Sequence, residues 1–187
     1  MRVITGTARG RRLSTLEGLE TRPTAERVKE GLFSAIQFDI TGRRVLDLFA
    51  GSGQLGIECL SRGAAEAVFV DSNPRALETV RENLRRTGLA RRAAVVAGDA
   101  LAYLESAPPR RFSLIFLDPP YETNLLENAL KRIAAFDILA PYGIIAAEHP
   151  AAWIPPETAF RLYREYRYGK IAVTVFRAES GEEKSGK

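Results

Sequence analysis

The string Asp118-Pro119-Pro120-Tyr121 directly follows the apolar run 112–117 and is the most chemically specific feature of the sequence. Two prolines fix the backbone, so the Pro119 carbonyl can be held in one direction. If Asp118 and that carbonyl each accept an N–H from the exocyclic amine of a base, the lone pair of the amine is aimed at an electrophilic carbon. Catalysis would then consist of positioning and electrostatics. Tyr121 offers a ring for a base taken out of its stack. Asp118, Pro119 and Tyr121 are therefore the catalytic candidates.

A glycine pattern, Gly51-x-Gly53-x-x-Gly56, lies between a predicted strand and a predicted helix. Glycines there allow a tight turn and let a ligand approach the backbone closely. Taken alone, the pattern suits a nicotinamide or flavin dinucleotide, or S-adenosylmethionine (AdoMet). Asp47, just before the glycines, favours AdoMet, because a dinucleotide phosphate is repelled by a carboxylate whereas AdoMet has an ammonium group to meet it.

Two more carboxylates follow predicted strands. Asp71 lies 20 residues beyond Gly51, where it can accept both hydroxyls of a ribose. Asp99 follows the next strand and can accept a hydrogen bond from an adenine amino group, although an Asp there also suits capping of the helix that begins at Ala100. Ligands bind at the carboxyl ends of parallel strands, so both carboxylates should face one crevice. The predicted cofactor-binding residues are thus Asp47, Gly51, Gly53, Asp71 and Asp99.

Strands and helices alternate along most of the chain. The apolar pattern predicts strands at 45–49, 67–70, 93–97, 114–117, 144–147, 160–168 and 171–176. It predicts helices from Thr24 as N-cap, at 54–61, from Pro74 to just before Gly88, at 100–105 and at 125–136. This alternation predicts an α/β fold with a parallel sheet covered by helices on both faces, closed by a β-hairpin rather than a helix.

The first twelve residues are strongly basic. They contain Arg2, Arg9, Arg11 and Arg12 and no acid, a charge of +4 that equals the net charge of the whole chain. A turn around residues 8–10 predicts a β-hairpin there. Such an arm is expected to meet a polyanion, and Arg9, Arg11 and Arg12 are the RNA-binding candidates. A solvated strand rich in arginine explains the charge equally well.

Composition sets the remaining bounds. A chain of 187 residues with 45% hydrophobic residues suits one globular domain, and no apolar run approaches the ~18 residues of a membrane helix. With one cysteine, no signal-peptide pattern and a single histidine, we expect a cytoplasmic protein without a metal site. The expected organisation is an N-terminal hairpin and helix at 1–41, a core at 42–177 and a polar tail at 178–187.

Four stretches together resemble the RsmD family of bacterial methyltransferases: residues 2–13, 21–33, 45–58 and 117–121. The resemblance spans roughly residues 1–177. It implies a class I AdoMet-dependent methyltransferase fold, a seven-stranded Rossmann-like sheet whose last strand is antiparallel. It further implies methylation of a guanine N2 in 16S rRNA, within a small-subunit ribonucleoprotein. By the same resemblance, Arg22 and Thr24 lie beside the methionine end of the cofactor. Relatives often have Glu where this chain has Asp71, and either residue can hold a ribose diol.

Other functions remain open at this point. A DNA adenine or cytosine N-methyltransferase uses the same amine chemistry, but it normally needs a separate recognition domain for which the spacing leaves no room. A protein glutamine methyltransferase typically has Asn in place of Asp118. A catalytically silent RNA-binding factor in ribosome assembly would not need an intact Asp118 or glycine loop. A dehydrogenase is compatible with the glycine pattern alone.

Overall fold

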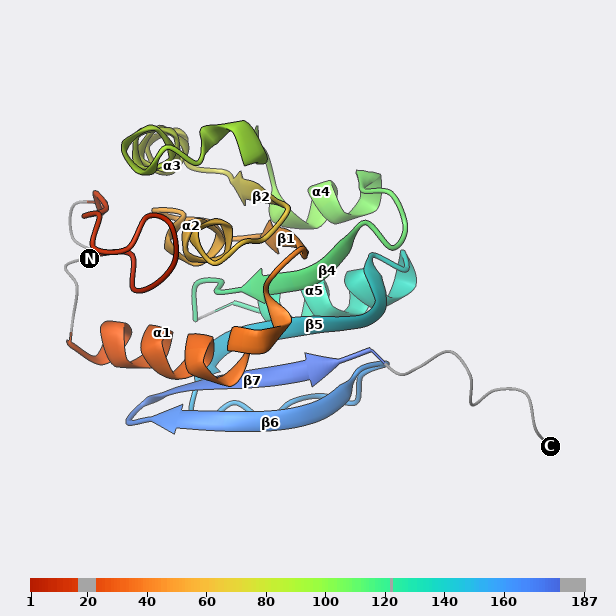
Figure 1. Ribbon diagram of the computed structural model, residues 1–187. Helices are drawn as coiled ribbons and strands as arrows, with labels where there is room; N and C mark the ends of the chain where they lie inside the picture. Colours follow the sequence, from red (N-terminus) through yellow and green to blue (C-terminus); the bar gives the residue numbers. More distant parts are fainter. Residues whose placement is uncertain (17–22, 122, 179–187) are drawn as a thin grey trace.

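A computed structural model describes residues 1–16, 23–121 and 123–178 of the chain (Figure 1). Its centre is a seven-stranded sheet in the order β3-β2-β1-β4-β5-β7-β6. The strands are β1 (Arg44–Asp47), β2 (Glu66–Asp71), β3 (Ala93–Ala97), β4 (Phe112–Leu117), β5 (Leu139–Pro150), β6 (Arg161–Tyr168) and β7 (Ile171–Arg177). Neighbouring strands are parallel except at β7, which is antiparallel to both β5 and β6. The expected sheet, with its antiparallel last strand, is confirmed.

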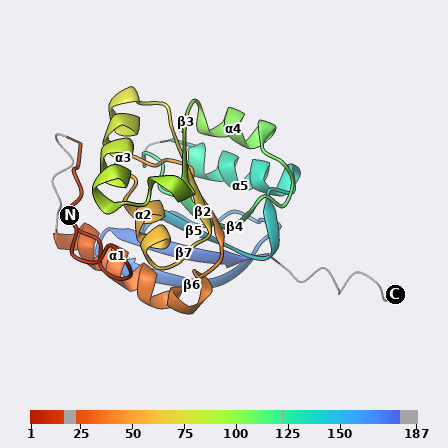
Figure 2. The ribbon, with the colours of Figure 1, turned by 45° about the horizontal axis from the view of Figure 1, so that its top comes forward.

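Helices cover both faces of the sheet (Figure 2). They are α1 (Pro23–Ala35), α2 (Gln54–Ser61), α3 (Pro74–Thr87), α4 (Ala100–Ser106) and α5 (Leu125–Ala135), with 3₁₀ turns η1 (Gln37–Asp39) and η2 (Ala90–Arg92). The helices α1, α2 and α3 share one hydrophobic cluster with the sheet, whereas α4 and α5 belong to a second cluster on the other face. None of the helices within the described ranges is long and apolar enough to cross a membrane.

Local signals in the sequence explain the helix ends. In α3, the Asn73 side chain accepts the Arg75 backbone N–H, Pro74 occupies the first turn and Gly88 closes the helix with a φ of 74°. A proline at the start costs no hydrogen bond, and glycine adopts the left-handed conformation without strain. The helix α2 and the strand β3 have the bounds expected from the sequence.

The N-terminal segment is a hairpin-shaped loop without the two strands expected for it. A single antiparallel bridge joins Arg2 and Arg12. The amides of Ile4 and Thr5 instead donate to the Glu58 carboxylate, at 2.8 and 3.0 Å. Because α2 takes these backbone groups, they are not available to extend a ladder. The loop still shares the hydrophobic cluster of α1, α2 and α3 with the core, through Val3, Ala8 and Leu13.

The expectation that Thr24 caps the first helix is wrong. The helix α1 begins at Pro23, so Thr24 lies within its first turn. Proline suits a first helical position because that residue needs no N–H partner. The apolar face predicted for this helix is correct, since Val28, Leu32, Phe33 and Ile36 are buried. Arg22 and most of the predicted tail, 179–187, lie outside the described residues.

Candidate active site

The carboxyl ends of the parallel strands form a cleft of about 600 Å³. The cleft lies between the ends of the neighbouring strands β1 and β4, from which the chain continues to opposite faces of the sheet. Ligands usually bind at this position in a parallel sheet. The predicted residues Gly51, Asp71, Asp99, Asp118, Pro119 and Tyr121 all line it. The cleft thus brings together residues that are up to 70 positions apart in the chain (Gly51 to Tyr121). Of the other candidates, Arg22 and the side chain of Thr24 fall outside the described part of the chain.

The glycine loop is shaped by backbone conformations that favour glycine. Gly51 and Gly53 have φ values of 52° and 76°, in the left-handed region. Gly56 has a different role, because a Cβ there would lie 2.4 Å from the ring of Phe69. The third glycine of the pattern therefore permits close packing of α2 on β2, while the first lines the cleft.

Asp71 connects the glycine loop to the turn after β2. One carboxylate oxygen accepts the Gly51 amide at 2.8 Å and the other accepts the Asn73 amide at 2.8 Å. Each oxygen still has a free lone pair for a ligand hydroxyl. Asp99 accepts the Ala102 amide at 2.9 Å, so it caps α4 and also lines the cleft. The two interpretations of Asp99 derived from the sequence are therefore compatible.

Asp47 lies beneath the glycine loop, only 2% exposed. Its carboxylate accepts the Gly56 amide at 3.0 Å. Burial raises the pKa of Asp47 to about 7, although the Gly56 hydrogen bond favours the ionised form. Asp47 and Gly53 are not among the residues that line the cleft. Direct contact of Asp47 with a cofactor ammonium group stays a prediction.

Asp118 stands at the end of β4 between two cavities. It lines the main cleft and also a smaller cavity of about 100 Å³, which Lys29, Gln54 and Glu148 share. Burial raises the pKa of Asp118 well above the usual range, and the nearby charges of Glu148 and Asp47 raise it further. The carboxyl group of Asp118 is therefore held where water is scarce and a polar partner is needed.

Glu148 is a site residue that the sequence reasoning missed. The Tyr121 hydroxyl donates a hydrogen bond to the Glu148 carboxylate. Burial raises the pKa of both groups, and the Tyr121 hydroxyl bond favours the ionised form of Glu148. A signal was present in the sequence, because Glu148 is an acid placed directly after the apolar run 144–147.

The three arginines predicted to bind RNA are not among the residues that line the cleft. Arg9, Arg11 and Arg12 are exposed. Their loop is fixed to the carboxyl-terminal half of α2, where the Thr7 amide donates to the Ser61 carbonyl at 2.9 Å. After the arginines the chain returns toward the glycine loop, because the Ser14 amide donates to Asn83 at 2.8 Å and Asn83 donates to the Ser52 carbonyl at 2.9 Å. Contact of these arginines with RNA stays a prediction.

Comparison with known proteins identifies the family. The family described as Conserved hypothetical protein 95 matches residues 1–177. This chain belongs to that family. The RsmD resemblance is confirmed, because the protein named Ribosomal RNA small subunit methyltransferase D of Haemophilus influenzae is 35% identical over 180 residues, covering 94% of this chain and 93% of its own.

Two further family relatives agree. YlbH of Bacillus subtilis, whose name proposes an rRNA methyltransferase, is 42% identical over 181 residues, which cover 95% of this chain and 98% of YlbH. A solved structure of yhhF from Escherichia coli, described as a proposed methyltransferase, has a TM-score of 0.84 and 33% identity. The match covers 96% of this chain and 98% of yhhF. The chain therefore has the AdoMet-dependent methyltransferase fold and is a member of an rRNA methyltransferase family.

Proposed function

We propose that this protein transfers a methyl group from AdoMet to the exocyclic N2 amine of a guanine in 16S rRNA. The observation that carries the proposal is the position of Asp118 and Pro119 in the same cleft as Gly51 and Asp71. An amine acceptor and a methyl donor would thereby meet at one edge of the sheet. The names of the relatives support an rRNA substrate.

The cleft fits AdoMet in size and chemistry. Its volume of about 600 Å³ falls in the roughly 300–1,000 Å³ range of small-molecule sites. Asp71 would accept the ribose hydroxyls, and Asp99 the adenine amino group, while Gly51 presents no Cβ to the ligand. Following the family resemblance, we assign Arg22 and Thr24 to the methionine end, with Asp47 beneath the glycine loop. When bound, AdoMet supplies a methyl group on a positively charged sulfur.

The residues of the chain would act on the base by orienting it. The amine of guanine is a poor nucleophile because its lone pair is delocalised into the ring. Ionised Asp118 and the Pro119 carbonyl each accept one N–H, which directs the lone pair toward the methyl group. The Asp118 carboxylate then takes the proton that the amine loses on methylation. The ring of Tyr121, 45% exposed at the cleft, stacks on the base. Glu148 holds that ring through its hydroxyl.

An RNA substrate is favoured over DNA by the organisation of the chain. Within the described residues, short segments connect the strands and no separate domain is inserted that would read a groove. The exposed arginines of residues 9–12 fit phosphate contacts. We propose 16S rRNA in a small-subunit ribonucleoprotein as the partner, which places the activity in the bacterial cytoplasm.

The test is incubation with labelled AdoMet and small ribosomal subunits from a strain lacking the activity, followed by mapping of the labelled nucleotide. Asp118→Ala should lower methyl transfer by at least ~100-fold, as for loss of one positioned polar group. AdoMet affinity should change little, because Asp71 and Asp99 are intact. Glu105→Ala, which removes an acid at an exposed ion pair with Arg132, is the control. Near wild-type turnover of Asp118→Ala would refute the mechanism, and label on no RNA would refute the function.

A further inference from the structure

The β6–β7 hairpin is a second basic segment that the charge of the whole chain conceals. Residues 161–177 contain five basic residues and one acid, for a net charge of +4: Arg161, Arg164, Arg167, Lys170 and Arg177 against Glu165. The first twelve residues also carry +4, and the chain in total carries +4. All other residues together therefore carry −4. Positive charge is concentrated in two segments, not in one.

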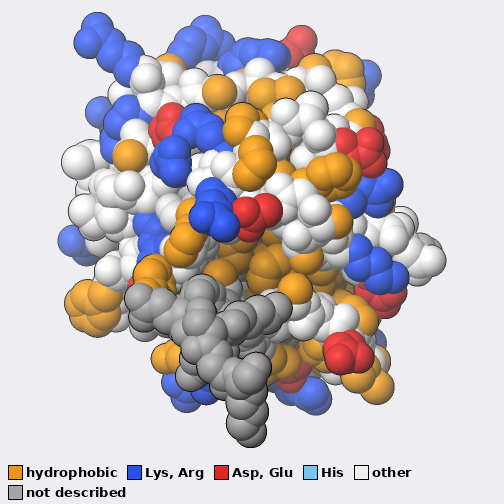
Figure 3. All heavy atoms as spheres, turned by 90° about the vertical axis from the view of Figure 1, so that its right-hand side faces the viewer, with side chains coloured by type: hydrophobic (Ala, Val, Ile, Leu, Met, Phe, Trp, Pro, Cys, Tyr) orange, Lys and Arg blue, Asp and Glu red, His pale blue; other side chains and the backbone are white. Residues whose placement is uncertain are grey.

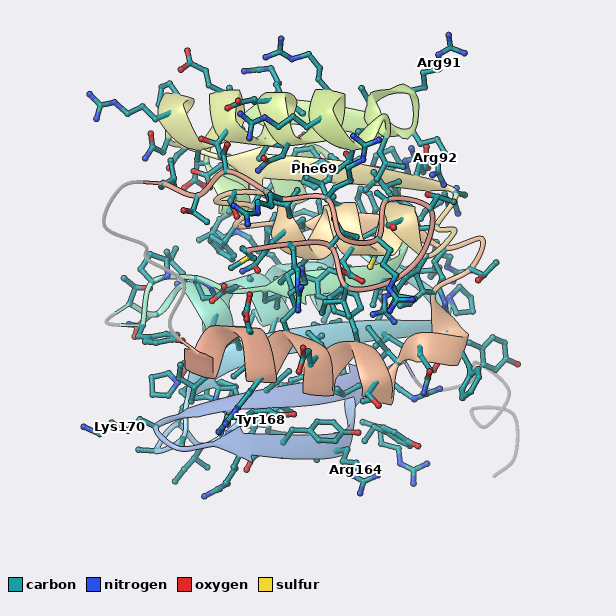
Figure 4. The ribbon with its side chains drawn as sticks, turned by 60° about the vertical axis from the view of Figure 1, so that its left-hand side comes forward. Phe69, Arg91, Arg92, Arg164, Tyr168 and Lys170 are labelled. Carbon is teal, nitrogen blue, oxygen red and sulfur yellow. The ribbon has the colours of Figure 1, made fainter. Side chains whose placement is uncertain are left out.

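Three of these cations are exposed and unneutralised. Arg167 bonds Glu165 and Arg177 bonds Asp39. Arg161, Arg164 and Lys170 are exposed and take part in no ion pair with any residue that the structure describes. Arg164 and Lys170 project from the hairpin into solvent (Figure 4). Unpaired cations of this kind are available to phosphate groups.

The turn of the hairpin lies on the same side of the sheet as the cleft. The strand β6 is the edge strand and runs in the same direction as β4 and β5, so its end lies on the cleft side of the sheet. The Lys170 carbonyl accepts the Ala151 amide at 2.9 Å. Two residues before Pro150, Glu148 pairs with Val173 of β7. The Lys170 backbone is thereby fixed beside Ala151, three residues along the chain from Glu148.

Arginine and tyrosine side chains are interleaved on this edge. The Arg164 guanidinium lies 5.4 Å from the ring centre of Tyr166, and that of Arg177 lies 4.5 Å from the ring of Tyr163. The Tyr163 side chain is 54% exposed. Aromatic rings and guanidinium planes are the groups on which unpaired RNA bases stack.

We propose that the β6 edge, from Arg161 to Lys170, binds a single-stranded RNA segment next to the target nucleotide. The inference rests on the proposed rRNA substrate. It assigns phosphate contacts to Arg161, Arg164 and Lys170. These contacts would hold the RNA segment that flanks the target nucleotide while the nucleotide itself lies in the cleft. In Figures 1 and 4, α1 lies between this edge and the N-terminal loop, so the two basic segments grip on either side of that helix.

Charged side chains on an edge strand also prevent sheets of different molecules from pairing, and either positive or negative charge serves this purpose. The edge has four cations against a single acid, a bias that protection alone does not explain. A charge reversal separates the two roles. Arg164→Glu with Lys170→Glu keeps the edge charged and protected, but it repels RNA.

The experiment measures affinity for unmodified 16S rRNA against salt concentration for the full chain. The neutral variant Arg161→Gln/Arg164→Gln/Lys170→Gln should flatten the slope of log K against log salt by up to about 2–3, as for three lost phosphate contacts. The control Arg44→Gln/Arg91→Gln/Lys131→Gln removes the same charge from three other exposed positions. Arg91 and Lys170 lie at opposite ends of the molecule (Figure 4). The control should keep the wild-type slope.

The charge-reversal variant should bind RNA more weakly than the neutral one, keep the sedimentation coefficient of the wild type and keep its AdoMet affinity. Equal slopes for the neutral variant and the wild type, or self-association of the neutral variant with unchanged RNA affinity, would overturn the inference. Methyl transfer by the wild-type chain is measured alongside. If the wild type methylates RNA and the slopes are equal, only the β6 assignment fails. If it methylates no RNA, the proposed function fails as well.

Discussion

The Tyr121 hydroxyl donates a hydrogen bond to the Glu148 carboxylate, which joins the turn after β4 to the end of β5 at the cleft. Tyr121 remains 45% exposed despite this bond and lines the cleft, so one end of the ring is fixed while part of its surface stays accessible. A stacking ring held in this way loses little freedom when a base arrives.

The roles of the Tyr121 ring and of its hydroxyl can be tested separately. Tyr121→Ala should lower kcat/KM by roughly tenfold or more, because stacking of a base on an aromatic ring contributes about 1–3 kcal/mol. Tyr121→Phe retains the ring and should lose much less. Glu148→Gln retains an acceptor for the hydroxyl and should resemble Tyr121→Phe. Steady-state methyl transfer to small subunits is the measurement, and equal losses for Tyr121→Phe and Tyr121→Ala would contradict the stacking role.

Asp118 predicts a pH dependence with a defined sign. Its pKa is raised by burial first and by the Glu148 charge next. The proposed role needs the ionised carboxylate, so methyl transfer should increase with pH through a pKa above the ordinary Asp value of ~4. Glu148→Gln removes one negative charge, which lowers the Asp118 pKa and moves this limb to lower pH. Single-turnover rates against pH for both chains provide the check. Coincident limbs would show that Glu148 does not influence the titrating group.

The sequence predicted the elements best where local signals agree with the tertiary packing. The ends of α3 follow from Pro74 and Gly88, which fix backbone conformation without help from distant residues. The strand β5 was predicted as 144–147 but runs over Leu139–Pro150. Pairing with β7 extends its carboxyl end, since Glu148 and Pro150 align with residues of that strand, and its amino end pairs with Phe112 of β4. These partners lie 21 to 27 residues away in the chain, where the local pattern does not reach.

The same distinction holds for the site. The sequence identifies the carboxylates that follow strands, because the carboxyl ends of parallel strands lie at the same edge of the sheet, where ligands bind. The Tyr121–Glu148 bond depends on how two loops face each other, which spacing does not specify. The docking of the N-terminal loop on Glu58 was missed for the same reason. The sequence indicates this docking only through Glu58, an acid in an otherwise apolar helix.

Gly56 predicts a stability defect that leaves the chemistry in place. A Cβ at Gly56 would lie 2.4 and 2.7 Å from two ring atoms of Phe69, which is fully buried. Gly56→Ala should lower the free energy of unfolding by about 1–3 kcal/mol through overpacking. In the double variant with Phe69→Leu the clash is relieved, so the combined cost should be smaller than the sum of the single costs. Denaturant unfolding measures all four chains. Strict additivity would show that the ring is not the obstacle.

The arrangement of the N-terminal loop leads to the last prediction. Glu58 is fully buried and accepts the Ile4 and Thr5 amides, while its carboxylate also bonds Lys29 and Arg62. The loop is thus held by backbone groups and a buried ion network. Its exposed arginines take no part in these contacts, so they can be removed without releasing the loop.

Arg9→Ala/Arg11→Ala/Arg12→Ala should therefore weaken binding to 16S rRNA while AdoMet affinity and the unfolding midpoint stay near the wild type. Each lost phosphate contact should flatten the slope of log K against log salt by about 0.7–0.9, and three by up to ~2–3. Because the loop and the β6 edge lie on opposite sides of α1, combining this triple with the neutral β6 variant should reduce the slope further, close to the sum of the two effects. Parallel lines for the arm variant and the wild type would show that these arginines make no phosphate contacts and that RNA is held by other residues.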